Sequence, residues 1–268
     1  MMHDILLQAA LAGSSVIMKY FKSDLKTNQK TSHHDIVTIA DTEAQSTIYK
    51  ALIEESLKHG LKANQIGFVG EEAGENRVAE YTFVVDPIDG TSNFAAGWEM
   101  FTISIAVVQK GKTIAAILYD PPKSTYYYAE LGRGAYKIKG GKKQKLEIVY
   151  RPPSELLFSA INTNDPARRK TLNELHGKLS ELFRENRLIG SITIEAIMLV
   201  TNVIGFKISY GPRVWDIAAA KLIIEEAGGV MLEWDGQDFD FDLTKPDKPY
   251  RSLACHPKNL SLILEALH

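Results

Sequence analysis

The sequence predicts a layered α/β protein, and three observations support this prediction. Its 268 residues include 45% hydrophobic side chains, which is enough to bury a substantial core. Segments with helical spacing and segments with strand-like alternation follow one another along the chain. Neither a repeat nor a convincing linker interrupts them. We therefore expect a single domain over residues 1–268, with two sub-lobes at about 1–150 and 151–268.

The first part of the chain predicts two helices followed by strands. Apolar residues between Leu6 and Phe21 recur at helical spacing, and residues 41–59 form a second helical pattern that ends at Gly60. From Thr102 to Ile138 the pattern becomes that of an antiparallel meander. Strands are expected at 66–69, 82–85, 102–109, 113–119, 124–129 and 135–138, and a further extended segment at 145–149 after the Gly140-Gly141 turn.

The second part alternates between strands and helices. A polar helix is expected at about 166–184, and a short helix follows Gly190-Ser191. A helix from Trp215 to Ala227 is followed by Gly228-Gly229, the residue type expected just past a helix end. The remaining expected elements are strands at 156–160, 203–210, 230–234 and 252–255 and a final helix at 257–267.

Composition argues against nucleic-acid binding and against insertion in a membrane. The formal net charge of −2 gives no basic excess of the kind that indicates nucleic-acid binding. The single cysteine, Cys255, cannot form an internal disulfide, and its apolar neighbours predict a buried thiol, which fits a reducing compartment. The N-terminus lacks the basic region of a signal peptide, and no apolar run reaches the ~18–20 residues of a membrane span. We expect a soluble, cytoplasmic protein with no membrane partner.

Acidic residues follow predicted strands or stand at the starts of predicted helices. Because carboxylates are hard oxygen ligands, several of them without cysteine or histidine favour magnesium or manganese over zinc. Two ions close together can stabilise both the attacking and the leaving oxygen of a phosphoryl transfer. The acidic residues concerned are Asp41, Glu71, Glu72, Asp86, Asp89 and Asp216.

The segment after Asp89 could supply an anion site. If Gly90-Thr91 begins a helical turn, its free backbone N–H groups can bind a phosphate, and the Thr91 hydroxyl can orient a water. The alternative is an ordinary turn, because Asp-Pro and Asp-Gly are common turn elements. Spacing alone leaves open whether Glu71 and Asp216 meet this segment in space.

Four segments, in order, resemble motifs of the inositol monophosphatase family. The longest, residues 86–94, reads Asp-Pro-Ile-Asp-Gly-Thr-Ser-Asn-Phe and resembles the family signature Asp-Pro-x-Asp-Gly-Thr-x-Asn-Phe. The others are residues 35–41, the Gly-Glu-Glu of residues 70–72, and residues 215–220 leading to 226–229. The resemblance covers essentially the whole chain. It implies an αβαβα sandwich of the inositol monophosphatase and fructose bisphosphatase type, usually a homodimer.

The resemblance also implies a site. Two or three Mg²⁺ ions would be held there, and Li⁺ would inhibit. The implied metal ligands are Glu71, Asp86, the Ile88 carbonyl, Asp89 and Asp216. The implied catalytic residues are Glu71, Thr91 and Asp41, with Thr91 hydrogen-bonded to Asp41 and orienting the attacking water. The implied substrate- and phosphate-binding residues are Asp89, Gly90, Thr91, Gly190, Ser191, Asp216 and Lys30.

The function implied is hydrolysis of a small phosphate monoester by in-line attack of water. The substrate expected first among the candidates is myo-inositol 1-phosphate. Departures from the family pattern leave other substrates open: histidinol phosphate, a sugar bisphosphate or a 3′-phosphonucleotide. Ser209 replaces a glutamate that contacts an inositol hydroxyl in animal enzymes, and Ile192 replaces a small residue. Arg213 could read an extra anionic group or be a solvated loop residue. A non-catalytic role in a transcription antitermination complex is the remaining alternative, without direct binding of nucleic acid.

Overall fold

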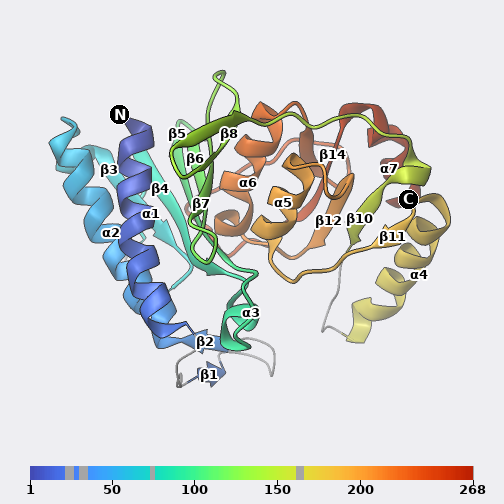
Figure 1. Cartoon of the computed structure of the whole chain (residues 1–268), viewed down its shortest axis with the longest axis horizontal. Helices are drawn as coiled ribbons and strands as arrows, with labels where there is room; N and C mark the ends of the chain where they lie inside the picture. The colour runs from blue at the N-terminus through green and yellow to red at the C-terminus, as the bar shows by residue number, and fades with distance from the viewer. Residues whose placement is uncertain (22–26, 30–35, 73–75, 161–165, 268) are drawn as a thin grey trace.

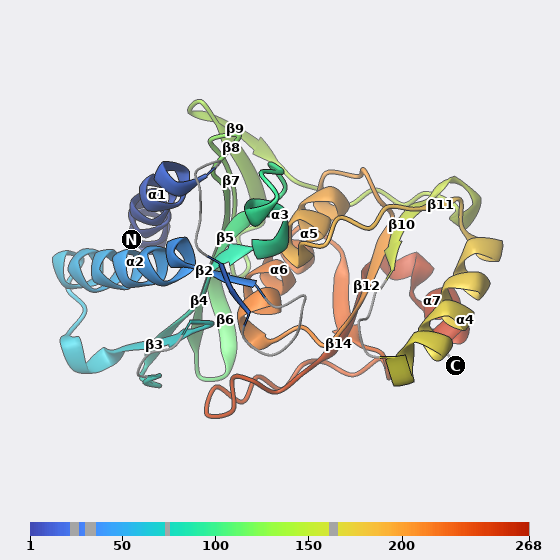
Figure 2. The same cartoon turned by 90° about the horizontal axis from the view of Figure 1, so that it is seen from below.

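Helices and sheets alternate in five layers along the long axis of the molecule (Figure 1). The computed structural model describes residues 1–21, 27–29, 36–72, 76–160 and 166–267. Figures 1 and 2 show helices on one face of the first sheet, between the two sheets, and beyond the second sheet. The αβαβα sandwich expected for this chain is therefore confirmed.

The outer helical layer consists of α1 (Met2–Tyr20) and α2 (Ile39–Lys58). Both helices bury residues at helical spacing, such as Ile5 and Ala9 in α1 and Ile48 and Leu52 in α2. These side chains pack on one face of the seven-stranded sheet and belong to one buried hydrophobic cluster. Both expected N-terminal helices are confirmed, and α2 begins two residues earlier than predicted.

The seven-stranded sheet has the order β3-β4-β5-β6-β7-β8-β9. Strands β3 and β4 are parallel, and all later neighbours are antiparallel, as the meander pattern predicts. The bounds are β3 (Ile66–Gly70), β4 (Tyr81–Asp89), β5 (Thr102–Gln109), β6 (Lys112–Asp120), β7 (Thr125–Glu130), β8 (Ala135–Lys139) and β9 (Lys142–Lys145).

The extended segment expected at 145–149 is wrong, since the strand in this region, β9, covers Lys142–Lys145. The strand instead begins directly after the glycine pair, because Gly140 and Gly141 both have positive φ, 54° and 76°, and form a two-residue hairpin turn. This turn pairs Lys139 with Lys142, and strand β9 therefore starts at Lys142 and ends at Lys145.

The central layer consists of α5 (Ile192–Val200) and α6 (Val214–Glu226). Both are apolar on most sides, as a helix between two sheets must be. The five-stranded sheet beyond them has the order β11-β10-β12-β14-β13 and is covered on its far face by α4 (Pro166–Leu182) and α7 (Leu260–Leu267). Its strands are β10 (Leu157–Ala160), β11 (Glu185–Asn186), β12 (Phe206–Tyr210), β13 (Val230–Glu233) and β14 (Arg251–Cys255).

Smaller elements complete the chain, and some differ from expectation. Strand β12 starts at Phe206 rather than at 203, because residues 201–205 turn there between α5 and the sheet. The two-residue β11 was not expected. The remaining elements are β1 (Thr27–Gln29), β2 (Ile36–Thr38), α3 (Thr91–Ala95) and the short 3₁₀ helices Ala63–Gln65, Pro153–Glu155 and Pro257–Asn259.

Two expectations from composition can be compared with the fold. Cys255 is buried in β14, and burial raises the pKa of its thiol to about 12, which agrees with a packing role. None of the helices in the described part of the chain has the length and apolarity needed to cross a membrane.

Candidate active site

Glu71 and Asp86 are neighbours because β3 and β4 run parallel, in a register that places Gly70 beside Val85. The Glu71 N–H donates to the Val85 carbonyl at 3.2 Å, so the pairing continues one residue beyond β3. The Glu71 and Asp86 carboxyl groups lie close enough to act on each other's ionisation. Since parallel strands end at the same sheet edge, the two acidic motifs of the sequence meet there.

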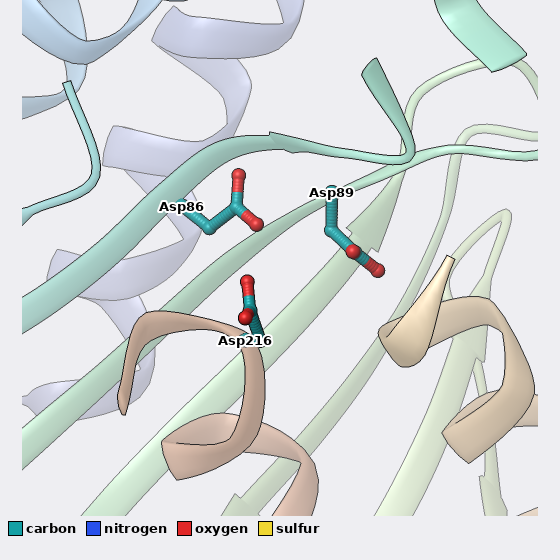
Figure 3. Close-up of side chains that lie close together, drawn as sticks. All are labelled: Asp86, Asp89 and Asp216. Atoms are coloured by element: carbon teal, nitrogen blue, oxygen red, sulfur yellow. The ribbon is translucent and has the colours of Figure 1, made fainter. Parts of the chain in front are cut away.

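Three aspartates converge at this edge (Figure 3). Asp86 and Asp89 come from β4, and Asp216 comes from the first turn of α6. One carboxylate oxygen from each lies within 4.8 Å of the others. Asp86 and Asp89 are buried, whereas Asp216 is partly exposed. The structure thus brings together three of the predicted metal ligands, from segments far apart in the sequence.

Asp89 is held at the start of helix α5. Its Oδ2 accepts hydrogen bonds from the Ser191 hydroxyl and the Thr193 N–H, both at 2.6 Å, and from the Thr193 hydroxyl. Its Oδ1 accepts from the Ile192 N–H at 3.3 Å. Ser191 is also the N-cap of the helix, accepting from the Ile194 N–H. Ser191, predicted to bind substrate, therefore orients a metal-ligand candidate.

The Gly90-Thr91 segment begins a helical turn, α3, as the anion-site hypothesis requires. Gly90 has φ of +97°, and a Cβ there would lie 2.8 Å from the Met100 carbonyl oxygen and 3.1 Å from Ser191 Cβ. Only glycine fits this approach. The Thr91 hydroxyl donates to the Ile88 carbonyl at 2.9 Å. The hydrogen bond expected from Thr91 to Asp41 stays a prediction.

Helix α2 contributes Asp41 and Gln45, both buried, on the side of the site nearest β3. The Gln45 amide donates to the Glu72 carbonyl at 2.9 Å and accepts from the Glu72 N–H at 2.8 Å. This pair of bonds fixes the backbone on which Glu71 sits. Asp41 lies close enough to Glu71 to act on its ionisation.

The site concentrates like charges. Burial, Asp216 and Asp41 raise the pKa of Glu71 to about 8. Burial and the Glu71 and Asp89 carboxylates raise the pKa of Asp86 well above its usual range. Burial and Asp89 raise the pKa of Asp216 to about 7, against the opposing effect of the Arg213 N–H and guanidinium. A divalent cation would relieve this repulsion.

The other residues predicted for the site lie around the cluster or outside the described part of the chain. Gly190, with φ of +79°, directly precedes the α5 N-cap. Ile88 is buried within β4 between Asp86 and Asp89, and its role as a carbonyl ligand stays a prediction. Lys30 lies outside the described residues. The catalytic roles of Glu71, Thr91 and Asp41 also stay predictions.

Several residues that shape the site were not singled out from the sequence. Three of them lie in helices, and the folding of the chain brings them to the site: Gln45, Thr193 and Glu195. Asn93 donates to the Met100 and Ile189 carbonyls and so joins α3 to the turn before α5. Asn93 does fall inside the signature-like segment, which is the one signal that could have identified it.

The donor set fits magnesium. The described residues of the cluster offer carboxylate oxygens and include neither a thiol nor an imidazole. The anionic cluster stands beside the glycine-lined start of α3. Such an arrangement can hold a divalent cation next to a bound phosphate.

Fold and site together define a layered αβαβα protein with a carboxylate centre suited to divalent cations. The sequence profile of the Inositol monophosphatase family matches residues 2–268. The chain belongs to this family.

Individual relatives are similar over most of their length. Nus factor SuhB of Vibrio cholerae serotype O1 is 31% identical over 241 residues, which cover 88% of this chain and 86% of that protein. Among solved structures, the extragenic suppressor protein suhB of Bartonella henselae superposes with a TM-score of 0.86 at 22% identity, covering 99% of this chain and 98% of that one. The IMPase of Thermotoga maritima gives 0.82 at 23% identity, covering 98% and 95%. These structural likenesses bear on the fold.

Proposed function

We propose that this protein is a magnesium-dependent hydrolase of small phosphate monoesters. The observation that carries the proposal is the convergence of Asp86, Asp89 and Asp216 within 4.8 Å, beside Glu71 and the start of α3. Family membership supports the same chemistry. Two or three Mg²⁺ ions, held by Glu71, Asp86, the Ile88 carbonyl, Asp89 and Asp216, are part of this proposal.

Each protein group has a role in the proposed reaction. Bound Mg²⁺ supplies charge neutralisation of the phosphate and lowers the pKa of water. Glu71 and Thr91 orient the water that attacks phosphorus in line, and Asp41 supports them. The backbone N–H groups of Gly90 and Thr91 bind phosphate oxygens. We assign Asp216 to the leaving-group side of the phosphate. The P–O bond to the alcohol breaks as the bond from the water oxygen to phosphorus forms, and the departing alkoxide takes up a proton from water.

The substrate we propose first is myo-inositol 1-phosphate. Two residues, Ser209 and Arg213, are reasons to test other substrates beside myo-inositol 1-phosphate. Ser209 on β12 is nearly buried and offers a hydroxyl where a carboxylate would give a charge-assisted hydrogen bond of ~1.5–3 kcal/mol. Arg213 is partly exposed, and its guanidinium stands close enough to Asp216 to act on its ionisation. From this position the guanidinium could bind a second anionic group of a substrate.

The test is kinetic. We would measure kcat/KM for myo-inositol 1-phosphate, histidinol phosphate, a sugar bisphosphate and a 3′-phosphonucleotide, with Mg²⁺ varied and Li⁺ added. We expect a strict Mg²⁺ requirement, inhibition by Li⁺ and a loss of at least about 100-fold in Asp86→Asn. Hydrolysis without any Mg²⁺ requirement, or full activity in Asp86→Asn, would reject the proposed mechanism.

A second candidate function is that of a Nus factor, because relatives up to 31% identical carry the name Nus factor SuhB. The test uses RNA polymerase purified from the organism that encodes this chain and the immobilised protein, as wild type and as Glu71→Gln. A Nus role predicts equal retention of polymerase by both, since the substituted side chain lies within the site. Absence of retention by the wild type would reject this candidate and leave the hydrolase proposal intact.

A further inference from the structure

A buried pair of opposite charges, Glu195 and Lys207, lies behind the start of helix α5. The side chains are 6% and 1% exposed, and Lys207 Nζ is 3.9 Å from Glu195 Oε2. Lys207 Nζ also donates to the Ile192 carbonyl at 2.8 Å. Burying two charges is costly unless their remaining hydrogen-bonding groups are satisfied, so such a pair needs an explanation.

Glu195 uses its other oxygen to hold a turn. Its Oε1 accepts from the Ile189 N–H at 3.1 Å and from the Gly190 N–H at 3.3 Å. Asn93 holds the same turn from the opposite side by donating to the Ile189 carbonyl at 3.1 Å. The turn is therefore fixed through both its donors and its acceptor.

This turn leads directly into the residues that orient Asp89. Ser191 follows Gly190, and its hydroxyl donates to Asp89 Oδ2 at 2.6 Å. The Thr193 N–H donates to the same oxygen at 2.6 Å. A shift of the turn would move these donors and, with them, the carboxylate of Asp89.

We propose that Glu195 is a positioning residue for Asp89, acting through the turn at Ile189 and Gly190, and that Lys207 neutralises its buried charge. The inference rests on the proposed function, because it takes Asp89 to be a ligand of Mg²⁺. Neither Glu195 nor Lys207 contacts the Asp89 carboxylate in the described hydrogen bonds. The role of Glu195 is to supply an acceptor of fixed geometry, and its negative charge is not itself required.

The acceptor and the charge can be separated by substitution. In a Lys207→Met background, Glu195→Gln removes the charge but keeps a carbonyl oxygen that can accept from both N–H groups. Glu195→Leu, of similar size, removes the acceptor as well. Lys207→Met alone leaves an uncompensated buried carboxylate and is expected to be the least stable of the three.

The readout is the affinity for Mn²⁺, a spectroscopic substitute for Mg²⁺, measured by the electron paramagnetic resonance signal of the free ion. Thermal melts without metal identify variants of comparable stability. We expect Lys207→Met/Glu195→Gln to bind Mn²⁺ within about threefold of wild type, and Lys207→Met/Glu195→Leu at least about tenfold more weakly, as second-sphere losses at metal sites typically are.

Equal Mn²⁺ affinity in the two double variants would overturn the positioning role and leave the metal site standing. Absence of Mn²⁺ binding in the wild type would overturn the proposed function and the inference together. If the leucine variant does not fold, Asn93→Ala releases the same turn from its other side. We then expect at least threefold weaker Mn²⁺ binding in that variant, on the same second-sphere grounds, and an unchanged affinity would overturn the proposal.

Discussion

At the scale of single residues, the three aspartates of the cluster, Asp86, Asp89 and Asp216, each accept a hydrogen bond from a nearby backbone N–H. Asp86 accepts from the Ile88 N–H at 2.9 Å, and Asp216 accepts from the Arg213 N–H at 2.6 Å. Asp89 accepts from several groups at the start of α5. These bonds direct carboxylate oxygens toward one another despite their mutual repulsion, so the cluster is arranged for a cation before one binds.

Substitution of Asp216 by asparagine tests this arrangement. Asparagine keeps an oxygen for the Arg213 N–H, so the cap of α6 should survive, while one negative charge of the cluster is lost. We expect Mg²⁺ affinity, measured by isothermal titration calorimetry, to fall at least about tenfold. This corresponds to a loss of ~1.4 kcal/mol or more of binding free energy when one charged ligand becomes neutral.

The matched measurement is the melting temperature of the metal-free variant. It should equal or exceed that of the wild type, because one of several like charges of the cluster has been removed. Unchanged Mg²⁺ affinity together with a lower melting temperature would show that Asp216 serves the helix alone.

Gly90 is a second residue whose replacement has a defined result. Alanine there would combine the positive φ of +97° with a Cβ only 2.8 Å from the Met100 carbonyl oxygen. We expect Gly90→Ala to lower the free energy of unfolding by about 2–4 kcal/mol in denaturant titrations, from strain plus overpacking.

Gly111→Ala is the control for the backbone contribution. Gly111 has φ of +74°, and a Cβ there meets nothing within 4 Å. Its cost should stay near the ~1–2 kcal/mol of the left-handed conformation. Equal losses in the two variants would mean that crowding at Gly90 contributes nothing.

At the scale of elements, the site depends on contacts between segments that are remote in sequence. Helix α2 holds the end of β3 through Gln45, and the turn before α5 receives the end of β4 through Ser191. Helix α6 adds Asp216 from the opposite side of the sheet edge. Displacement of any one of these elements would separate the carboxylates.

Gln45→Leu tests the contact between α2 and β3. It leaves the buried N–H and carbonyl of Glu72 without the two bonds that Gln45 supplies, at about 1–3 kcal/mol for each group. We expect a loss of about 2–6 kcal/mol in unfolding free energy and weaker Mg²⁺ binding by calorimetry. Lys50→Leu, an exposed change on the same helix, should stay within about 0.5 kcal/mol. Equal effects from both would contradict this role.

At the scale of the whole molecule, the carboxylate cluster lies where the first sheet meets the central helical layer, and its ionisation is coupled to folding. The folded-state pKa values of Glu71 and Asp216, about 8 and about 7, lie above the ordinary values of 4.5 and 3.8. Between these limits the folded, metal-free protein binds more protons than the unfolded chain. Its stability must therefore fall as pH rises through this window.

The corresponding prediction concerns melting temperature. Without metal, it should decrease from pH 5 to pH 8, other groups being equal. Because Mg²⁺ binds the deprotonated carboxylates, the increase caused by saturating Mg²⁺ should be larger at pH 8 than at pH 6. Calorimetric melts with Mg²⁺ or with a chelator measure both. A Mg²⁺ effect independent of pH would mean that these carboxylates are already ionised in the metal-free fold.

Much of this fold could be predicted from sequence, because helix and strand periodicity are local properties. Both N-terminal helices, the antiparallel meander and α6 occupy nearly their predicted ranges. The errors fall where a turn decides the boundary, as at Gly140-Gly141, or where pairing creates a two-residue strand such as β11. Pairing depends on a partner strand, and local pattern does not contain it.

The sequence by itself determined the elements, the carboxylate chemistry and the family, because these depend on residue type and spacing along one chain. Only the tertiary structure decided that Asp216 meets Asp86 and Asp89, and that Ser191 and Thr193 hold Asp89. It also revealed Gln45, Glu195 and Lys207 as supports of the site. Their contacts join side chains from different layers, and the positions of those layers follow from packing of the whole core rather than from any local segment.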